Sequence, residues 1–104
     1  MSAEYGLLRA ALLARTACFA FYDGYQRHFC PHVIGWKGNE EQVLCWQYAG
    51  ESSRPLPAEG QWKCFTVAKF SHLSTTAEAW RYGQPGRTGR PTSCVDIVDQ
   101  EIVL

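Results

Sequence analysis

The first segment of the chain has the hydrophobic pattern of a short amphipathic helix. Its apolar residues recur at helical spacing and form one stripe: Leu7, Leu8, Ala11 and Leu12. Ser2 is placed to cap the amino end, and Glu4 lies in the first turn, where a negative charge suits the helix dipole. We therefore expect a helix over about residues 2–15 that packs across the open end or the edge of a sheet.

Three β-prone segments follow and predict an antiparallel meander. They cover about residues 16–22, 26–36 and 42–48. Asp23-Gly24 separates the first two segments, which is a strong hairpin signal because glycine accepts the positive φ of a tight turn. A second glycine-containing turn at 37–39 separates the next two. Pro31 cannot donate a ladder hydrogen bond, so we expect a bulge or an unpaired edge in the second strand.

The second half of the chain predicts two more strands and a long loop. In order, we expect strands at about 61–67 and 70–75, a helical turn at 76–82 with Trp80 facing the sheet, an exposed mobile loop at 83–94, and a tail at 95–104. The loop prediction rests on its glycine and proline content and its lack of apolar residues. Periodicity does not decide whether the tail is a strand or a short helix. The chain of 104 residues is thus read as one mainly β (α+β) domain, with the sheet over about 16–82.

Charge and cysteine content narrow the class of protein. Ten basic and ten acidic side chains give a net charge of zero, which argues mildly against nucleic-acid binding through bulk electrostatics. The five cysteines contain no Cys-x-x-Cys pair, and they are Cys18, Cys30, Cys45, Cys64 and Cys94. We expect them to be reduced thiols, most of them in the core, in a cytoplasmic protein. No segment has the pattern of a signal peptide or a membrane span, so no membrane partner is expected.

Four stretches of the sequence carry a resemblance to a known family. They are Tyr22-Asp-Gly24, Arg27-His-Phe-Cys-Pro31, Lys63-Cys-Phe65-Thr-Val67-Ala-Lys69-Phe70, and the later residues Leu73, Thr76 and Trp80. With them, about residues 16–80 resemble the WYL domain, a small module common in bacterial regulators. The resemblance implies an antiparallel β-barrel of the Sm-like or SH3-like type. Gln42-Val43-Leu44 stands where the family has Trp-Tyr-Leu, and no winged helix precedes the module, so we expect a divergent, free-standing relative.

The resemblance also implies a function and a set of site residues. It implies a non-enzymatic regulatory module that senses a small anionic or nucleotide-like ligand. The implied ligand-binding residues are Tyr22, Arg27, His32 and Lys69. An alternative is a module that binds single-stranded nucleic acid, with contacts from Trp36, Arg87 and Arg90. A third is a structural or oligomerising domain, with a second copy or a regulatory protein as its partner.

Two constellations support or limit these expectations. Arg27 with Tyr22 and Lys69 could form an anion site, because a guanidinium matches phosphate and carboxylate groups; the alternative is a surface arginine paired with Asp23. His28, Cys30 and His32 share a strand face if no bulge intervenes, but they lie too far apart along the strand for one zinc ion. We therefore expect these two histidines to be structural, and we predict no catalytic residue, metal or cofactor.

Overall fold

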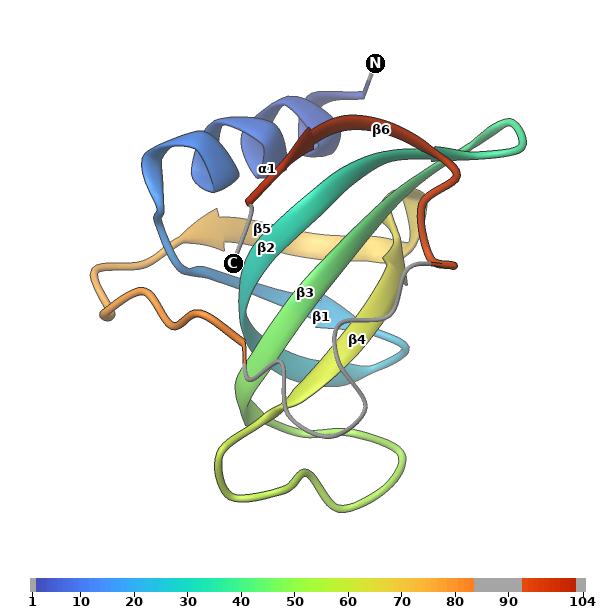
Figure 1. The fold of residues 1–104 in the computed structure, drawn as a ribbon. Helices are drawn as coiled ribbons and strands as arrows, with labels where there is room; N and C mark the ends of the chain where they lie inside the picture. The colour runs from blue at the N-terminus through green and yellow to red at the C-terminus, as the bar shows by residue number, and fades with distance from the viewer. Residues whose placement is uncertain (1, 84–92, 103–104) are drawn as a thin grey trace.

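The structure, a computed structural model, describes residues 2–83 and 93–102, and its main feature is a strongly curved antiparallel sheet (Figure 1). The elements are α1 (Ala3–Ala14), β1 (Cys18–Tyr22), β2 (Tyr25–Lys37), β3 (Glu40–Gly50), β4 (Gln61–Thr66), the short 3₁₀ helix η1 (Val67–Lys69), β5 (Phe70–Thr75) and β6 (Ile97–Glu101). The strand order is β4-β3-β2-β1-β5, and β6 pairs with β2. The predicted class, mainly β with an N-terminal helix, is confirmed. The sheet does not close over these residues, so a complete barrel stays a prediction.

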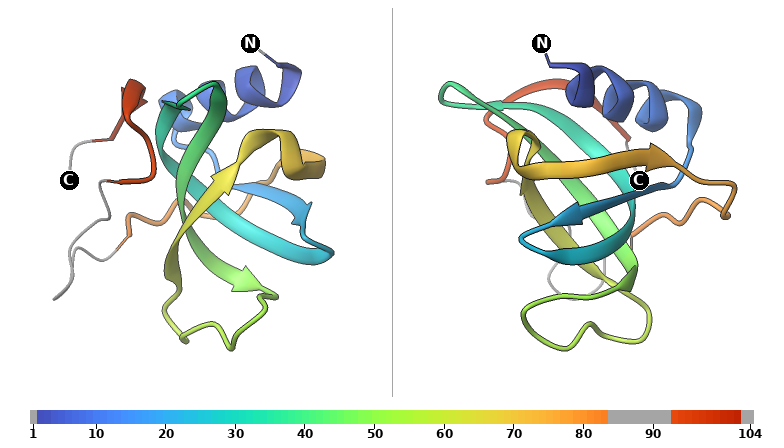
Figure 2. Two further views of the ribbon diagram at one scale, coloured as in Figure 1. Left: turned by 90° about the vertical axis from the view of Figure 1, so that its right-hand side faces the viewer. Right: turned by 180° about the vertical axis from the view of Figure 1, so that it is seen from behind.

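Helix α1 begins and ends as the sequence predicts. The Ser2 hydroxyl accepts a hydrogen bond from the Tyr5 backbone N–H at 3.1 Å, which satisfies one of the free donors of the first turn. Arg15 ends the helix in the left-handed conformation at φ 55°. Tyr5 is fully buried although the predicted apolar stripe omits it. The helix lies across one end of the sheet, with β5 and β1 beneath it in the rear view (Figure 2). No helix among the described residues is long and apolar enough to cross a membrane.

The two hairpins and the bulge follow from local turn chemistry. Asp23 and Gly24 both have positive φ, 52° and 79°, as the turn between β1 and β2 requires. The β2–β3 register shifts between Pro31 and Val33, so the predicted bulge lies where the chain lacks a donor. Both strands run further than expected, to Lys37 and Gly50, and form one long hairpin.

The core lies between α1 and the concave side of the sheet. Its largest fully buried side chains include Tyr5, Phe29, Phe65, Leu8 and Ile34. Burying an apolar side chain of this size contributes roughly 1.5–3 kcal/mol, so this cluster is the main source of stability. Strand β1 alternates between buried and half-buried residues, and its outward residues Phe19 and Phe21 are half-exposed.

The segment after β5 differs from the prediction. Residues 76–82 form no helical turn; they run as irregular chain, held at the start by a hydrogen bond from the Thr76 N–H to the Ala17 carbonyl at 2.8 Å. Trp80 is partly buried against the core, as expected. The predicted mobile loop at 83–94 is wrong at its ends, because Gly83 and Cys94 are buried; its residues 84–92 lie outside the described ones. The undecided tail contains the strand β6.

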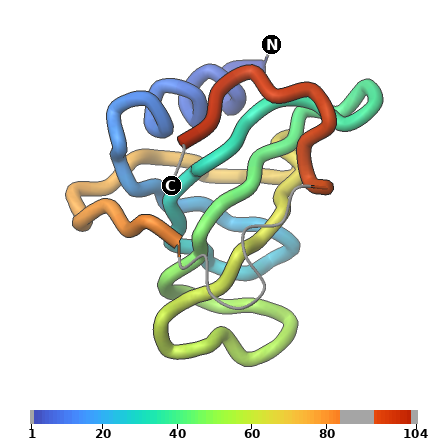
Figure 3. Tube along the Cα trace, viewed as in Figure 1, coloured from blue at the N-terminus to red at the C-terminus, as the bar shows by residue number. Residues whose placement is uncertain are grey.

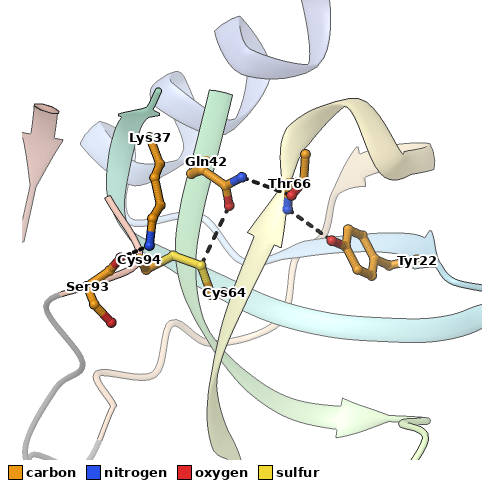
Figure 4. The surroundings of a disulfide bond; sticks show 7 residues. All are labelled: Tyr22, Lys37, Gln42, Cys64, Thr66, Ser93 and Cys94. Atoms are coloured by element: carbon orange, nitrogen blue, oxygen red, sulfur yellow. Dashed lines mark hydrogen bonds between the residues drawn. A yellow bond between two sulfur atoms is a disulfide. The ribbon is translucent and has the colours of Figure 1, made fainter. Parts of the chain in front are cut away.

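A disulfide joins Cys64 on β4 to Cys94 (Figure 4). The Cα atoms of the two residues lie 5.7 Å apart, and 30 positions separate them in the chain. A covalent loop of this length stabilises a domain by roughly 3–4 kcal/mol. The prediction of five reduced thiols is therefore wrong for this pair, and it is confirmed for Cys18, Cys30 and Cys45, which are buried thiols. Chain spacing could not show the pair, because only the tertiary path of residues 93–102 brings Cys94 to β4.

Candidate functional site

Arg27 is the most unusual charged residue among the described ones, because only 5% of its surface is exposed. It lies near the start of β2, opposite Gly50 at the end of β3. Its guanidinium carbon lies 5.3–5.6 Å from the ring centres of Tyr22, Tyr25 and Phe65. Such contacts favour a cation over an aromatic face. The predicted alternative, a surface arginine paired with Asp23, is wrong, since Arg27 is buried and no ion pair joins the two residues.

The guanidinium is held in place by neutral groups. Its Nη1 donates to Gln47 Oε1 at 3.0 Å, and its Nη2 donates to the Tyr22 carbonyl at 3.3 Å. Gln47 is itself fully buried, and its amide nitrogen donates to the carbonyls of Ala49 and Glu51. These bonds fix the amide so that its oxygen faces Arg27. The orientation of the Arg27 guanidinium is thus fixed by the fold itself.

The charge of Arg27 is not neutralised within residues 2–83 and 93–102. No carboxylate there forms an ion pair with it, and its buried Nε has no hydrogen-bond acceptor. Burial lowers the pKa of Arg27 below its ordinary value, while the nearby negative charge of Asp23 acts in the opposite direction. A buried, unpaired cation is costly, so the site favours an added negative charge.

Two further cations share this region. Burial lowers the pKa of Lys63 below its ordinary value, and the positive charges of Arg27 and Arg54 lower it further. The Lys63 ammonium donates to the Ser52 hydroxyl at 3.0 Å. Lys63 comes from β4, and Ser52 and Arg54 come from the loop that joins β3 to β4. We call Arg27, Lys63 and Arg54 the Arg27 cluster.

The four predicted ligand-binding residues do not all meet at this place. Tyr22 contacts Arg27, but its hydroxyl accepts a hydrogen bond from the Thr66 N–H at 3.0 Å, and its ring packs against Phe65. Lys69 is exposed in η1, and no described contact joins it to Arg27. The structure therefore brings together Tyr22 and Arg27, and Lys63 supplies the ammonium that the sequence assigned to Lys69.

His32 is placed in the interior of the molecule, fully buried. Its Nε2 accepts a hydrogen bond from the Gly83 N–H at 3.2 Å, so its Nδ1 carries the proton and donates to the Cys30 carbonyl at 2.8 Å. Its ring stacks on Trp80 at 5.2 Å. These contacts fit a structural histidine, and none of them joins His32 to the Arg27 cluster.

Neither a reactive Cys30 paired with His32 nor a metal site has supporting geometry in the part of the chain that the structure covers. The Cys30 sulfur accepts a hydrogen bond from the Arg81 N–H at 3.4 Å, and burial raises the pKa of this thiol. His32 contacts the Cys30 carbonyl and makes no described contact with its sulfur. His28 pairs with Glu78 at 3.2 Å. No group of three histidine, cysteine or acidic residues there could hold a metal ion.

Of the three predicted nucleic-acid contacts, the structure describes one, Trp36. Trp36 is half-buried and stacks on Tyr5 at 5.3 Å, so it is less exposed than expected. Arg87 and Arg90 lie outside the described residues. A different aromatic row faces outward from β1, with Phe19 beside Phe21 at 5.5 Å and beside His28 at 5.0 Å. The period-two alternation of side chains along β1 is the sequence signal that predicts this outward row.

A groove of about 340 Å³ lies apart from the Arg27 cluster, between α1 and β5. Glu4 and His72 border it together with apolar side chains, and no member of the Arg27 cluster does. His72 has a positive φ of 54° at the β1–β5 bulge, which accounts for its unusual backbone. The groove thus has no concentration of positive charge.

Searches against protein-family models, curated proteins and solved structures each found no match to this chain. The likeness to the WYL domain therefore stays a prediction. The case for a function rests on the geometry of the Arg27 cluster.

Proposed function

We propose that this protein is a non-enzymatic regulatory module that binds a small anionic ligand at the Arg27 cluster. The observation that supports this most is the buried guanidinium of Arg27, which has no carboxylate partner among the described residues. Phosphate and carboxylate groups match the planar fork of arginine, and charge-assisted hydrogen bonds to it are the strong ones. The proposal agrees with what the WYL resemblance implies.

The surroundings of the cluster favour a ligand that carries a flat ring beside its anionic group. Tyr25 is half-buried at the β1–β2 hairpin, 5.3 Å from the guanidinium carbon of Arg27. An aromatic face next to a fixed cation suits the stacking of a planar ring. Arg54 is exposed on the adjacent loop and is free to reach a second anionic group. A nucleotide-like anion has both parts.

The rival proposal is binding of single-stranded nucleic acid, and one observation favours it. The outward row of Phe19, Phe21 and His28 resembles a stacking surface, because bases stack on exposed aromatic rings. Salt separates the two ligands. Binding of a strand should weaken steeply as salt rises, whereas a compact site with a few ionic contacts should respond less.

The compartment belongs to the proposal as well. We place the module in the cytoplasm, in keeping with the three buried free thiols. In that compartment a disulfide such as Cys64–Cys94 is usually redox-active.

The test is titration calorimetry of the wild type with pyrophosphate, a mononucleotide and a short oligodeoxythymidine. We expect the mononucleotide to bind, and Arg27→Gln and Lys63→Gln each to weaken binding about tenfold or more, the usual value of a charged hydrogen bond. Arg9→Gln is the matched control, because Arg9 is already paired with Asp99 at 3.0 Å, and it should bind as the wild type does.

Three outcomes would contradict the proposal. Equal binding by Arg27→Gln and the wild type would exclude the cluster as the site. Preference for the oligonucleotide, with loss in a Phe19→Ala variant, would favour the rival proposal. A stable dimer that binds none of these probes would favour a structural or oligomerising domain. Lys63→Gln keeps the test valid if Arg27→Gln does not fold, since Lys63 is only partly buried.

A further inference from the structure

Residues 93–98 cross the long β2–β3 hairpin and are here called the strap (Figure 3). The Cys64–Cys94 disulfide ties its start to β4. Cys94 and Val95 pack against Val33 and Leu44, in a cluster separate from the main core. The Lys37 ammonium also donates to the Ser93 carbonyl at 2.9 Å (Figure 4).

The strap lies directly on β2 at a glycine. A Cβ atom on Gly35 would lie 1.9 Å from the Ile97 carbonyl oxygen and 2.8 Å from Val95 Cγ1. No side chain fits at this distance, so glycine allows the two backbones to approach. The strap is therefore a fitted part of the fold and not a random contact of the chain.

The end of the chain after the strap is held by different contacts. The β2–β6 register shifts between Ile34 and Gly35, which divides β6 into two halves. In the half that belongs to the strap, Ile97 is 61% exposed and Val98 is 45% exposed. In the other half, Asp99 accepts hydrogen bonds from the Tyr5 hydroxyl at 2.7 Å and from Arg9 Nε at 3.0 Å.

Ile102 completes this second anchor. Its side chain is 1% exposed in the main core, and its N–H donates to the His32 carbonyl at 2.8 Å. The strap and the anchor therefore depend on different contacts. The disulfide belongs to the strap alone.

The cysteines differ in a way that singles out this bond. Cys64 is exposed on β4, whereas Cys18, Cys30 and Cys45 are buried thiols. Burial raises the pKa of the Cys18 thiol to about 12, and it raises the pKa of Cys45 well above its ordinary value. Buried thiols that stay protonated do not exchange with a disulfide. A reductant therefore has one accessible disulfide to attack, and none of the buried thiols competes with it for that bond.

We propose that the Cys64–Cys94 disulfide is a redox latch, and that its reduction by a dithiol frees the strap while residues 99–102 stay anchored. A thiolate of the dithiol attacks the Cys64 sulfur, forms a mixed disulfide and expels Cys94 as a thiolate, which takes up a proton. The second thiol of the reductant then attacks the reductant sulfur that is bonded to Cys64, and Cys64 leaves as a thiolate that takes up a proton. The dithiol leaves as a disulfide, and two electrons and two protons have passed to the protein. Freeing the strap uncovers Val33 and Leu44.

Amide hydrogen exchange on the full chain tests the latch, since it reads local opening at single positions. The Asp96 N–H donates to the Trp36 carbonyl at 2.9 Å and reports on the strap, and the Ile102 N–H reports on the anchor. On addition of dithiothreitol we expect exchange at Asp96 to quicken about tenfold or more, from the lost loop constraint, and exchange at Ile102 to change less than about twofold. The Glu51 N–H, which donates to the Gln26 carbonyl, lies outside the strap and the anchor and serves as the control; its exchange should not change.

A double variant, Cys64→Ser with Cys94→Ser, should show the fast Asp96 exchange without reductant and should not respond to it. Several results would overturn the proposal. One is the absence of a linked Cys64–Cys94 peptide in a non-reducing digest. Another is unchanged exchange at Asp96 after reduction. If all three amides quicken together, the bond is a staple of the whole fold and not a latch. Reduction of the wild type decides the matter alone if the double variant does not fold.

Discussion

Arg9 and Arg27 show two ways in which this small fold accommodates a guanidinium. Arg9 projects from α1, is about one third exposed at its side chain, and pairs with Asp99 on β6. Arg27 is almost fully buried, and the hydrogen bonds that it makes to the described residues go to the neutral oxygens of Gln47 and Tyr22. The first arrangement is complete as it stands and joins two elements of the fold. The second leaves a buried positive charge with no ion-pair partner among the described residues, which is the expected condition of a site that receives an anion.

The largest expected effect comes from removing the aromatic support beneath Arg27. Phe65 is buried against Tyr22, Phe29 and Phe70 as well as against the guanidinium. Phe65→Ala should lower the free energy of unfolding by about 3–5 kcal/mol, because it leaves a large cavity in the core. Urea denaturation measures this.

The matched control for that variant is Leu13→Ala, whose side chain is half-exposed on α1. It should change stability by less than about 0.5 kcal/mol. If Phe65→Ala lowers the free energy of unfolding as little as Leu13→Ala does, the rings around Arg27 are not part of the main core.

An intermediate effect comes from making Arg9 resemble Arg27. Asp99→Asn removes the charge that Arg9 and Tyr5 share, and should cost about 1.5–3 kcal/mol in unfolding free energy at neutral pH. The hydrogen bond from Tyr5 and then that from Arg9 lower the pKa of Asp99 below its ordinary 3.8. A lowered carboxyl pKa contributes stability above the unfolded value, and this stability is lost as pH falls through the folded value.

The pH profile is the check on that variant. The wild type should lose stability as pH falls below about 4, and Asp99→Asn should lose less over the same interval. Parallel profiles for the two proteins would show that folding does not lower the pKa of Asp99. Asn at this position keeps the side-chain shape and so serves as its own steric control.

The smallest expected effect comes from a substitution in α1 that changes the contacts of neither Arg9 nor Arg27. Gly6 lies within α1, and a Cβ atom there would meet no atom within 4 Å. Gly6→Ala should therefore raise the unfolding free energy by about 0.5–1 kcal/mol through helix propensity. Ligand binding at the Arg27 cluster should stay unchanged. A loss of stability would mean that α1 is more tightly packed at this point than the structure shows.

Local chemistry explains what the sequence could predict. Ser2 caps α1, Asp23-Gly24 turns the first hairpin, and Pro31 marks the bulge, since each acts on neighbours a few residues away. The strand at 70–75 also lies where it was expected. These signals determine the elements and the fold class.

The site depended on tertiary geometry that such signals do not contain. Lys63 lies two residues before Phe65 and so shares its strand face, next to Arg27, whereas Lys69 follows in η1 after the strand ends. A resemblance between motifs could not separate these two lysines. The family resemblance implies His32 as a ligand-binding residue, although the bulge and the irregular chain up to Gly83 enclose it. The pairing of Cys64 with Cys94 likewise depended on the path of the strap.

The central claim is that Arg27 and Lys63 form one cluster of positive charge that has no ion-pair partner in residues 2–83 and 93–102. The pKa of Lys63 tests this claim most directly. Nuclear magnetic resonance of the lysine side-chain carbons measures it in the wild type, in Arg27→Gln, and in the wild type with pyrophosphate. We expect a Lys63 pKa below the ordinary lysine value, raised by the removal of Arg27 and raised again by the bound anion. A Lys63 pKa that responds neither to Arg27→Gln nor to pyrophosphate would contradict the account.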